Sequence, residues 1–173
     1  MFFIWYGGLV SFGGMIGGFL TAWLILRAKK EPVLKWFDLG IIGLLIGWAF
    51  GRIGCLLSGD SFGVYTTSFI AIWGRIPTQI FESVWVLICA GLLFLLFRKR
   101  EDWQLPNGVI FLSGIGLYSL GRFTIDFFRD EKIFFRYLHA SQWGSLLIFV
   151  IVVVILWQLL KGRKVNKYGS ESF

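Results

Sequence analysis

Two arginines, Arg52 and Arg122, lie near the ends of strongly apolar stretches, where an isolated charge is energetically costly. An ionisable side chain at membrane depth commonly marks a functional site and has an anionic partner. The guanidinium group of arginine suits phosphate, because it can donate two parallel hydrogen bonds to it. The two residues therefore predict a site that binds an anion, and a phosphate group fits their chemistry.

Other polar residues recur near the same ends of the apolar stretches, and almost none are expected in the opposite half. Snorkelling of helix-end side chains to the interface would explain single members of this set. It explains the whole set poorly, because the set contains both signs of charge and can form a buried network around a hydrated cavity. Tyr118 lies one helical turn before Arg122 and shares its helix face. The predicted cluster consists of Ser11, Arg52, Gln79, Glu82, Tyr118, Arg122, Asp126 and Gln142.

The elements that position these residues are predicted to be membrane-spanning helices. Of the 173 residues, 57% are hydrophobic and only 16% are charged, whereas a soluble domain is roughly 45–50% apolar. About 20 apolar residues span a bilayer, so we expect an all-α, polytopic helical bundle of about five spans, forming a single domain over residues 1–173. The expected spans are residues 2–26, 36–57, 79–97, 109–128 and 142–160.

Lysine and arginine predict how these spans are oriented, since cytoplasmic loops accumulate basic residues. Most of the 17 basic residues lie in residues 27–35, 98–100 and 161–167. This pattern places the N-terminus outside, the C-terminus in the cytoplasm and the polar cluster towards the outer face. Topology thus accounts for the net charge of +7, and nucleic acid is not expected as a partner. An outer-leaflet cavity meets phospholipid head groups first, so an anionic phospholipid is the expected ligand.

Metal and disulfide chemistry are not indicated by the sequence. Cys55 and Cys89 are far apart within apolar runs, and His139 is the single histidine; neither pattern has the spacing of a metal site. The second apolar stretch has glycines every three or four residues, which predicts a face for close helix packing. These glycines are Gly40, Gly43, Gly47, Gly51 and Gly54.

Several segments resemble, in order, the bacterial prolipoprotein diacylglyceryl transferases. GRIGCLLSGDSFG (51–63) is similar to the signature of that family, IPTQIFES (76–83) to its H-P-[ST]-Q-[LI]-Y-E motif, and LYSLGRFTIDFFR (117–129) to its Y-x-x-x-R-x-x-x-E-x-x-R segment. GGLVSFGGMIGG resembles a glycine-rich H-G-G segment, and SQWGSLL resembles the start of the last span. The resemblance suggests a divergent or N-terminally shortened member.

The resemblance implies an enzyme that transfers the diacylglyceryl group of phosphatidylglycerol to the lipobox cysteine of a prolipoprotein, the first step of bacterial lipoprotein maturation. Such an enzyme works at the outer face of the plasma membrane, forms a thioether, releases glycerol phosphate and needs no cofactor. Its implied partners are phosphatidylglycerol, prolipoprotein signal peptides with a lipobox cysteine and the lipid bilayer. The implied catalytic residues are Arg52, Tyr118 and Arg122, and the implied substrate-binding residues are Ser11, Gly13, Gly14, Arg52, Gln79, Glu82, Asp126, Arg129 and Gln142.

The sequence departs from the family pattern at two histidines. Phe12 replaces the histidine of H-G-G, and Ile76 replaces the histidine of H-P-[ST]-Q, so the expected base for the thiol is missing. Either the arginine-centred site suffices, or the chain is a non-catalytic lipid-binding relative. A small anion transporter or channel is the third reading, since arginines paired with carboxylates suit that class too. Further departures are Cys55, Ser58, Asp60 and Phe81.

Overall fold

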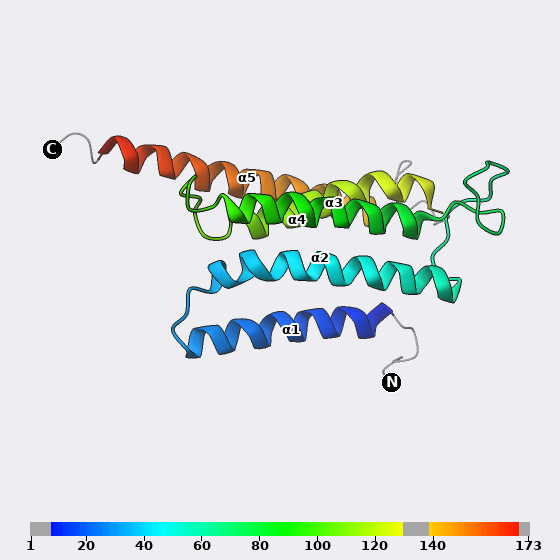
Figure 1. Cartoon of the computed structure of the whole chain (residues 1–173), viewed down its shortest axis with the longest axis horizontal. Helices are drawn as coiled ribbons and strands as arrows, with labels where there is room; N and C mark the ends of the chain where they lie inside the picture. The colour runs from blue at the N-terminus through cyan, green and yellow to red at the C-terminus, as the bar shows by residue number, and fades with distance from the viewer. Residues whose placement is uncertain (1–7, 130–138, 170–173) are drawn as a thin grey trace. The chain divides into compact units, whose positions relative to one another are not determined.

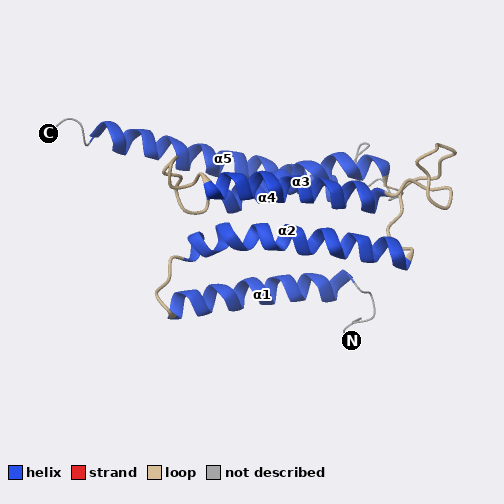
Figure 2. Ribbon diagram, viewed as in Figure 1, coloured by secondary structure: helices blue, strands red, loops and turns tan. Residues whose placement is uncertain are grey.

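The computed structural model describes residues 8–129 and 139–169, and these residues are largely helical (Figures 1 and 2). Within them, β-structure is limited to isolated bridges, two within the connection after the second helix and one between Gly63 of that connection and Arg129. The predicted all-α fold class is therefore confirmed. The elements are α1 (Gly8–Ala28), α2 (Val33–Ser58), α3 (Thr78–Arg98), α4 (Val109–Ile125), the short 3₁₀ helix η1 (Asp126–Phe128) and α5 (Ala140–Gly169).

Four helical segments are long and apolar enough to cross a membrane: Val33–Ser58, Thr78–Arg98, Val109–Phe128 and Ser141–Lys161. The first predicted span corresponds to α1, of which Ile16–Ala28 counts as a shorter apolar helix; residues 1–7 lie outside the described part. The protein is thus a multi-pass helical membrane protein. The chain divides into two compact units, residues 1–36 and 37–173, and each is described by itself.

In the second unit, helices α2 to α5 alternate in direction, so α2 and α4 begin at the end where α3 and α5 approach their C-termini (Figure 1). The buried core lies mainly between α2 and α3, where Ile41 and Leu45 meet Val86 and Leu93, and Ile110 of α4 completes it. Large apolar side chains on the outer surfaces of the helices are exposed, as expected for side chains that face lipid. The core therefore fixes the relative positions of three of these helices.

Two glycines of α4 allow this close packing. A Cβ atom on Gly114 would lie 2.5 Å from Cγ1 of Ile41, and one on Gly121 would overlap the indole of Trp85. The indole N–H of Trp85 donates to the carbonyl oxygen of Leu117 at 2.9 Å, which holds the ring against α4. These positions bring α2 and α3 close to α4.

The glycine face predicted on the second span makes no such close contact within the second unit. Among the described residues of the second unit, no atom of another element lies within 4 Å of a Cβ built on any of the glycines in α2. The regular spacing was read correctly as one helix face, but spacing alone does not say which helix face meets a neighbour. Because the two units are described separately, close packing on this face of α2 stays a prediction; within the second unit, the closely packed helix glycines include Gly114 and Gly121 of α4.

A buried carboxylate lies at the start of α2, in the half where almost no polar groups were expected. Asp38 is fully buried and accepts hydrogen bonds from the backbone N–H groups of Gly108 and Phe111, both at 2.8 Å. Its Oδ2 also lies 3.4 Å from Nη1 of Arg100. Asp38 thus satisfies backbone donors at the start of α4, which a helix leaves without intrahelical partners. Asp38 is an exception to that expectation, because a buried helix start needs an acceptor for its backbone N–H groups.

The connection between α2 and α3 extends beyond the ends of these helices (Figure 1) and is held at its base. Gly63 donates its N–H to the carbonyl of Ile76 at 2.8 Å, and Val64 donates to that of Phe128 at 3.0 Å. A Cβ atom on Gly63 would overlap the carbonyl oxygen of Phe128, so glycine is required where these backbones meet. The base of the connection is therefore tied to η1, beside the predicted polar cluster.

Candidate active site

Glu82, in the second turn of α3, connects the two arginines that the sequence singled out. Its Oε1 lies 3.0 Å from Nε of Arg52, and its Oε2 lies 3.1 Å from Nη1 of Arg122. The Glu82 side chain is only 4% exposed. One buried carboxylate therefore pairs with guanidinium groups from two different helices.

Helix direction explains why these residues meet. Arg52 and Arg122 lie towards the C-terminal ends of α2 and α4, whereas Glu82 lies near the N-terminus of the oppositely directed α3. The N-terminal end of a helix favours negative charge and the C-terminal end favours positive charge. Each charged side chain is thus placed at the end of its helix that stabilises it.

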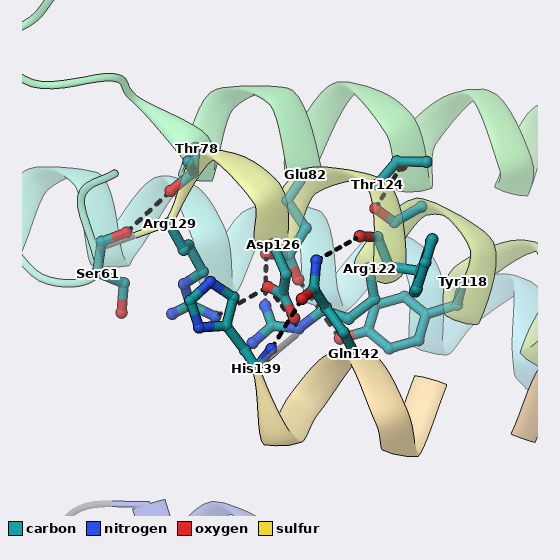
Figure 3. Close-up of polar contacts among 12 residues, drawn as sticks. Ser61, Thr78, Glu82, Tyr118, Arg122, Thr124, Asp126, Arg129, His139 and Gln142 are labelled. Atoms are coloured by element: carbon teal, nitrogen blue, oxygen red, sulfur yellow. Dashed lines mark hydrogen bonds and ion pairs between the residues drawn. The ribbon is translucent and has the colours of Figure 1, made fainter. Parts of the chain in front are cut away.

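Asp126 is the second carboxylate of the site and is fully buried at the start of η1. Its Oδ1 lies 3.4 Å from Nε of Arg122 and 3.6 Å from Nη1 of Arg129, and Figure 3 shows it between these two side chains. Arg129 also pairs with Gly63 in a β-bridge. Asp126 therefore links the arginine of α4 to the segment that holds the α2–α3 connection.

The arginines are more accessible than the carboxylates that hold them. The side chains of Arg52 and Arg122 are 13% and 16% exposed, against 0% for Asp126. Glu82 pairs with a single nitrogen of each arginine, and a guanidinium group carries five N–H donors. An incoming anion would meet the guanidinium groups first, with donors beyond those used in the two ion pairs.

Two aromatic side chains also donate to Glu82. The hydroxyl of Tyr118 lies 3.4 Å from Oε1, and the indole N–H of Trp48 donates to the same oxygen at 3.0 Å. Trp48 was not among the residues predicted to form the polar cluster. Its position four residues before Arg52, on the same helix face, was the signal available in the sequence.

The two predicted glutamines make contacts with the backbone. Gln79 donates its side-chain N–H to the carbonyl of Asp60, in the α2–α3 connection. Gln142 accepts the backbone N–H of His139 at 2.9 Å and donates to the carbonyl of Phe123 at 3.4 Å. A glutamine that accepts the N–H three residues before it caps a helix start, here that of α5 (Figure 3). Both glutamines are buried and hold the site together; their contact with a substrate stays a prediction.

Three predicted residues lie in the first unit, on α1. Gly13 and Gly14 are exposed there, and the side chain of Ser11 lies outside the described part of the chain. Their contribution to the site stays a prediction. In the described residues there is no group of three or more side chains of the types that hold metal ions. The predicted residues that the structure brings together are Arg52, Glu82, Tyr118, Arg122, Asp126 and Arg129.

Known proteins are similar to nearly the whole chain. Residues 1–158 match the sequence model of a family described as "Prolipoprotein diacylglyceryl transferase". A Clostridium botulinum protein named phosphatidylglycerol–prolipoprotein diacylglyceryl transferase is 28% identical over 91% of this chain. Proteins of the same name are 31% identical in Clostridium perfringens, over 93% of this chain, and 30% identical in Clostridium kluyveri, over 94%. The matches cover 66%, 66% and 68% of the three relatives, so the chain spans about two thirds of their length.

Proposed function

Because this chain belongs to the prolipoprotein diacylglyceryl transferase family, we propose that it transfers the diacylglyceryl group of phosphatidylglycerol to the lipobox cysteine of prolipoproteins. The observation that carries this proposal is the pair Arg52 and Arg122, both held by Glu82. The names of the similar proteins supply the two substrates. The two guanidinium groups support a contact with the phosphate that joins the diacylglyceryl group to its head group.

The proposed role of the arginines is to stabilise the negative charge on the phosphate during the reaction. The cysteine sulfur forms a bond to the terminal glyceryl carbon of the lipid while the bond from that carbon to the phosphate oxygen breaks. Glycerol phosphate leaves with the bonding electrons, and the thiol proton passes to solvent or to another group. Guanidinium donors held in place before the reaction stabilise the charge that develops on the phosphate. Glu82 and Asp126 orient these donors, and Tyr118 supports Glu82.

The site is proposed to face the outer side of a bacterial plasma membrane. The basic residues of the sequence favour the α3–α4 turn and the C-terminus on the cytoplasmic side. The polar cluster lies at the opposite end of the second unit, beside the connection between α2 and α3. In this orientation it is near the head groups of the outer leaflet, where a lipobox cysteine arrives.

A lipid-binding relative without chemistry is the second candidate. It is favoured by Phe12 and Ile76, which occupy positions where the family pattern has histidines. Such a protein would keep the arginine pair and the phosphate contact but would lack the means to deprotonate a thiol.

Mass spectrometry of a lipobox peptide separates the two candidates. The purified full chain is incubated with phosphatidylglycerol and the peptide, beside the variants Arg122→Ala and Arg98→Ala. We expect a diacylglyceryl adduct with the parent and with Arg98→Ala, because Arg98 is an exposed residue at the other end of α3. Arg122→Ala is expected to lose at least 100-fold in rate, because a pre-organised charged donor is removed.

Each alternative result has a defined meaning. Phosphatidylglycerol bound by the parent without an adduct would establish the lipid-binding relative. An Arg122→Ala protein as active as the parent would show that this arginine does not hold the reacting phosphate.

A further inference from the structure

Trp48 donates a hydrogen bond to Glu82, in addition to the contacts that Glu82 makes with the two arginines. Its indole N–H donates to Oε1 of Glu82 at 3.0 Å, the oxygen that also pairs with Nε of Arg52. A buried carboxylate needs several donors to stay charged. The indole N–H fixes the rotation of the carboxylate, so that Oε2 is directed to Arg122.

The ring of Trp48 also contacts the guanidinium group of Arg52. The Cζ atom of Arg52 lies 5.3 Å from the centroid of the indole, within the range of a cation–π interaction. Arg52 is therefore held on one side by the ring face and on another by the Glu82 carboxylate. A long side chain with two such contacts loses rotational freedom before any ligand arrives.

A third contact places the indole against Tyr118. The two rings meet edge to face, with centroids 5.6 Å apart and an interplanar angle of 82°. Tyr118 itself reaches Glu82 with its hydroxyl at 3.4 Å. Trp48 thus touches three members of the polar cluster, from both its ring and its N–H group.

We infer that Trp48 is a positioning residue that holds Arg52 and Glu82 in the geometry that receives the phosphate of the lipid. The inference rests on the proposed function for the identity of that lipid. It adds to that function a residue that contacts no reacting atom and acts through its neighbours. Its effect should therefore appear in the affinity for the phosphate-bearing substrate, and not for the peptide.

Trp48→Phe tests the inference, because phenylalanine keeps an aromatic face and removes the N–H donor. The dissociation constant of a short-chain phosphatidylglycerol and the KM values for lipid and peptide are measured on the full chain. We expect affinity for the lipid to fall about tenfold to 100-fold, as for the loss of one hydrogen bond to a charged group, and the KM for the peptide to be unchanged. A loss of folded protein would lower kcat and leave both KM values unchanged.

Trp103→Phe is the matched control. Trp103 also carries a cation over its ring, with Nζ of Lys99 at 5.6 Å, but it is exposed and lies at the other end of the second unit. The control is expected to bind the lipid with the affinity of the parent. In a Glu82→Gln background, Trp48→Phe is expected to change affinity by less than about twofold, because the two residues act as one unit.

Two outcomes would overturn the inference. One is a Trp48→Phe protein whose lipid affinity matches that of the parent; the other is an effect of equal size with and without Glu82→Gln. If Trp48→Phe fails to fold, benzothienylalanine at position 48 has nearly the same shape without the N–H group and gives the same test. The binding measurement is independent of turnover, so a parent that binds lipid and forms no adduct would reject the proposed reaction and still decide the role of Trp48.

Discussion

At the scale of single residues, each carboxylate of the site pairs with two arginines. Glu82 is within 3.1 Å of a nitrogen of Arg52 and of Arg122, and Asp126 takes a second nitrogen of Arg122. Each guanidinium group is therefore fixed through a carboxylate that it shares with another arginine. A change at one carboxylate should alter two cations together.

Glu82→Gln tests this sharing. Glutamine keeps the size of the side chain but loses the charge and presents one acceptor oxygen, so one of the two arginines loses its contact with residue 82. We expect the rate of the proposed diacylglyceryl transfer to fall on the order of 100-fold, as when one pre-organised charged contact is removed. The rate is measured with phosphatidylglycerol and a lipobox peptide.

Glu101→Gln is the control for that change. Glu101 is exposed in the α3–α4 turn, at the other end of the second unit, and its replacement is expected to leave the rate unchanged. A Glu82→Gln protein that keeps the parental rate would mean that the arginines do not need this carboxylate.

Much of this residue-scale picture could be predicted from the sequence. Arg52 and Arg122 stood out because a charge is rare in an apolar stretch, and Glu82 and Asp126 followed as carriers of the opposite charge. The pairing could not be predicted, because it depends on how three helices are rotated about their axes. Trp48 was missed because tryptophan is a common residue in an apolar helix and does not stand out there as a charged residue does.

At the scale of the helices, the close approach of α3 to α4 positions Arg122. Gly121 is adjacent to Arg122 and lies against the indole of Trp85, where a Cβ atom would overlap the ring. Hydrophobicity predicts that α4 spans the membrane. It does not predict how the helix is rotated about its own axis. Gly114 and Gly121, the glycines of α4 that lie against Ile41 and Trp85, are seven residues apart, so no regular three- or four-residue spacing marked them in the sequence.

Gly121→Ala should destabilise the protein. The added methyl group has to displace Trp85, which is tied to Leu117, and we expect a loss of about 1–3 kcal/mol, typical of overpacking. Gly91→Ala on α3 is the control, because a Cβ atom there has open space. Thermal unfolding in detergent compares the two. Equal unfolding temperatures would indicate that α4 can shift at no cost.

Asp38 should be equally important for the opposite end of α4. Asp38→Ala leaves the backbone N–H groups of Gly108 and Phe111 without their acceptor and Arg100 without its ion pair. Breaking a buried ion pair from one side costs about 3–5 kcal/mol, so a marked drop in unfolding temperature is expected. Asp102→Ala, at an exposed position in the α3–α4 turn, should have no such effect. Similar unfolding temperatures for the two variants would refute the capping role.

At the scale of the whole molecule, the orientation in the membrane can be tested by labelling. Phe69 in the α2–α3 connection is 99% exposed, and Trp103 in the α3–α4 turn is also exposed. In a background of Cys55→Ser and Cys89→Ala, we expect an impermeant maleimide to label Phe69→Cys in intact cells. Trp103→Cys should react after permeabilisation. The reverse pattern would reject an outward-facing site.

The clamped base of the α2–α3 connection has a practical consequence for handling the protein. Gly63, Val64 and Ile76 hold the two ends of the connection together by backbone hydrogen bonds, while the tip around Phe69 is open. Loop tips tolerate insertions when the backbone at their base stays paired. An epitope tag or a small reporter domain inserted at Phe69 would give antibodies and cryo-electron microscopy a fixed point on a molecule otherwise covered largely by detergent or lipid.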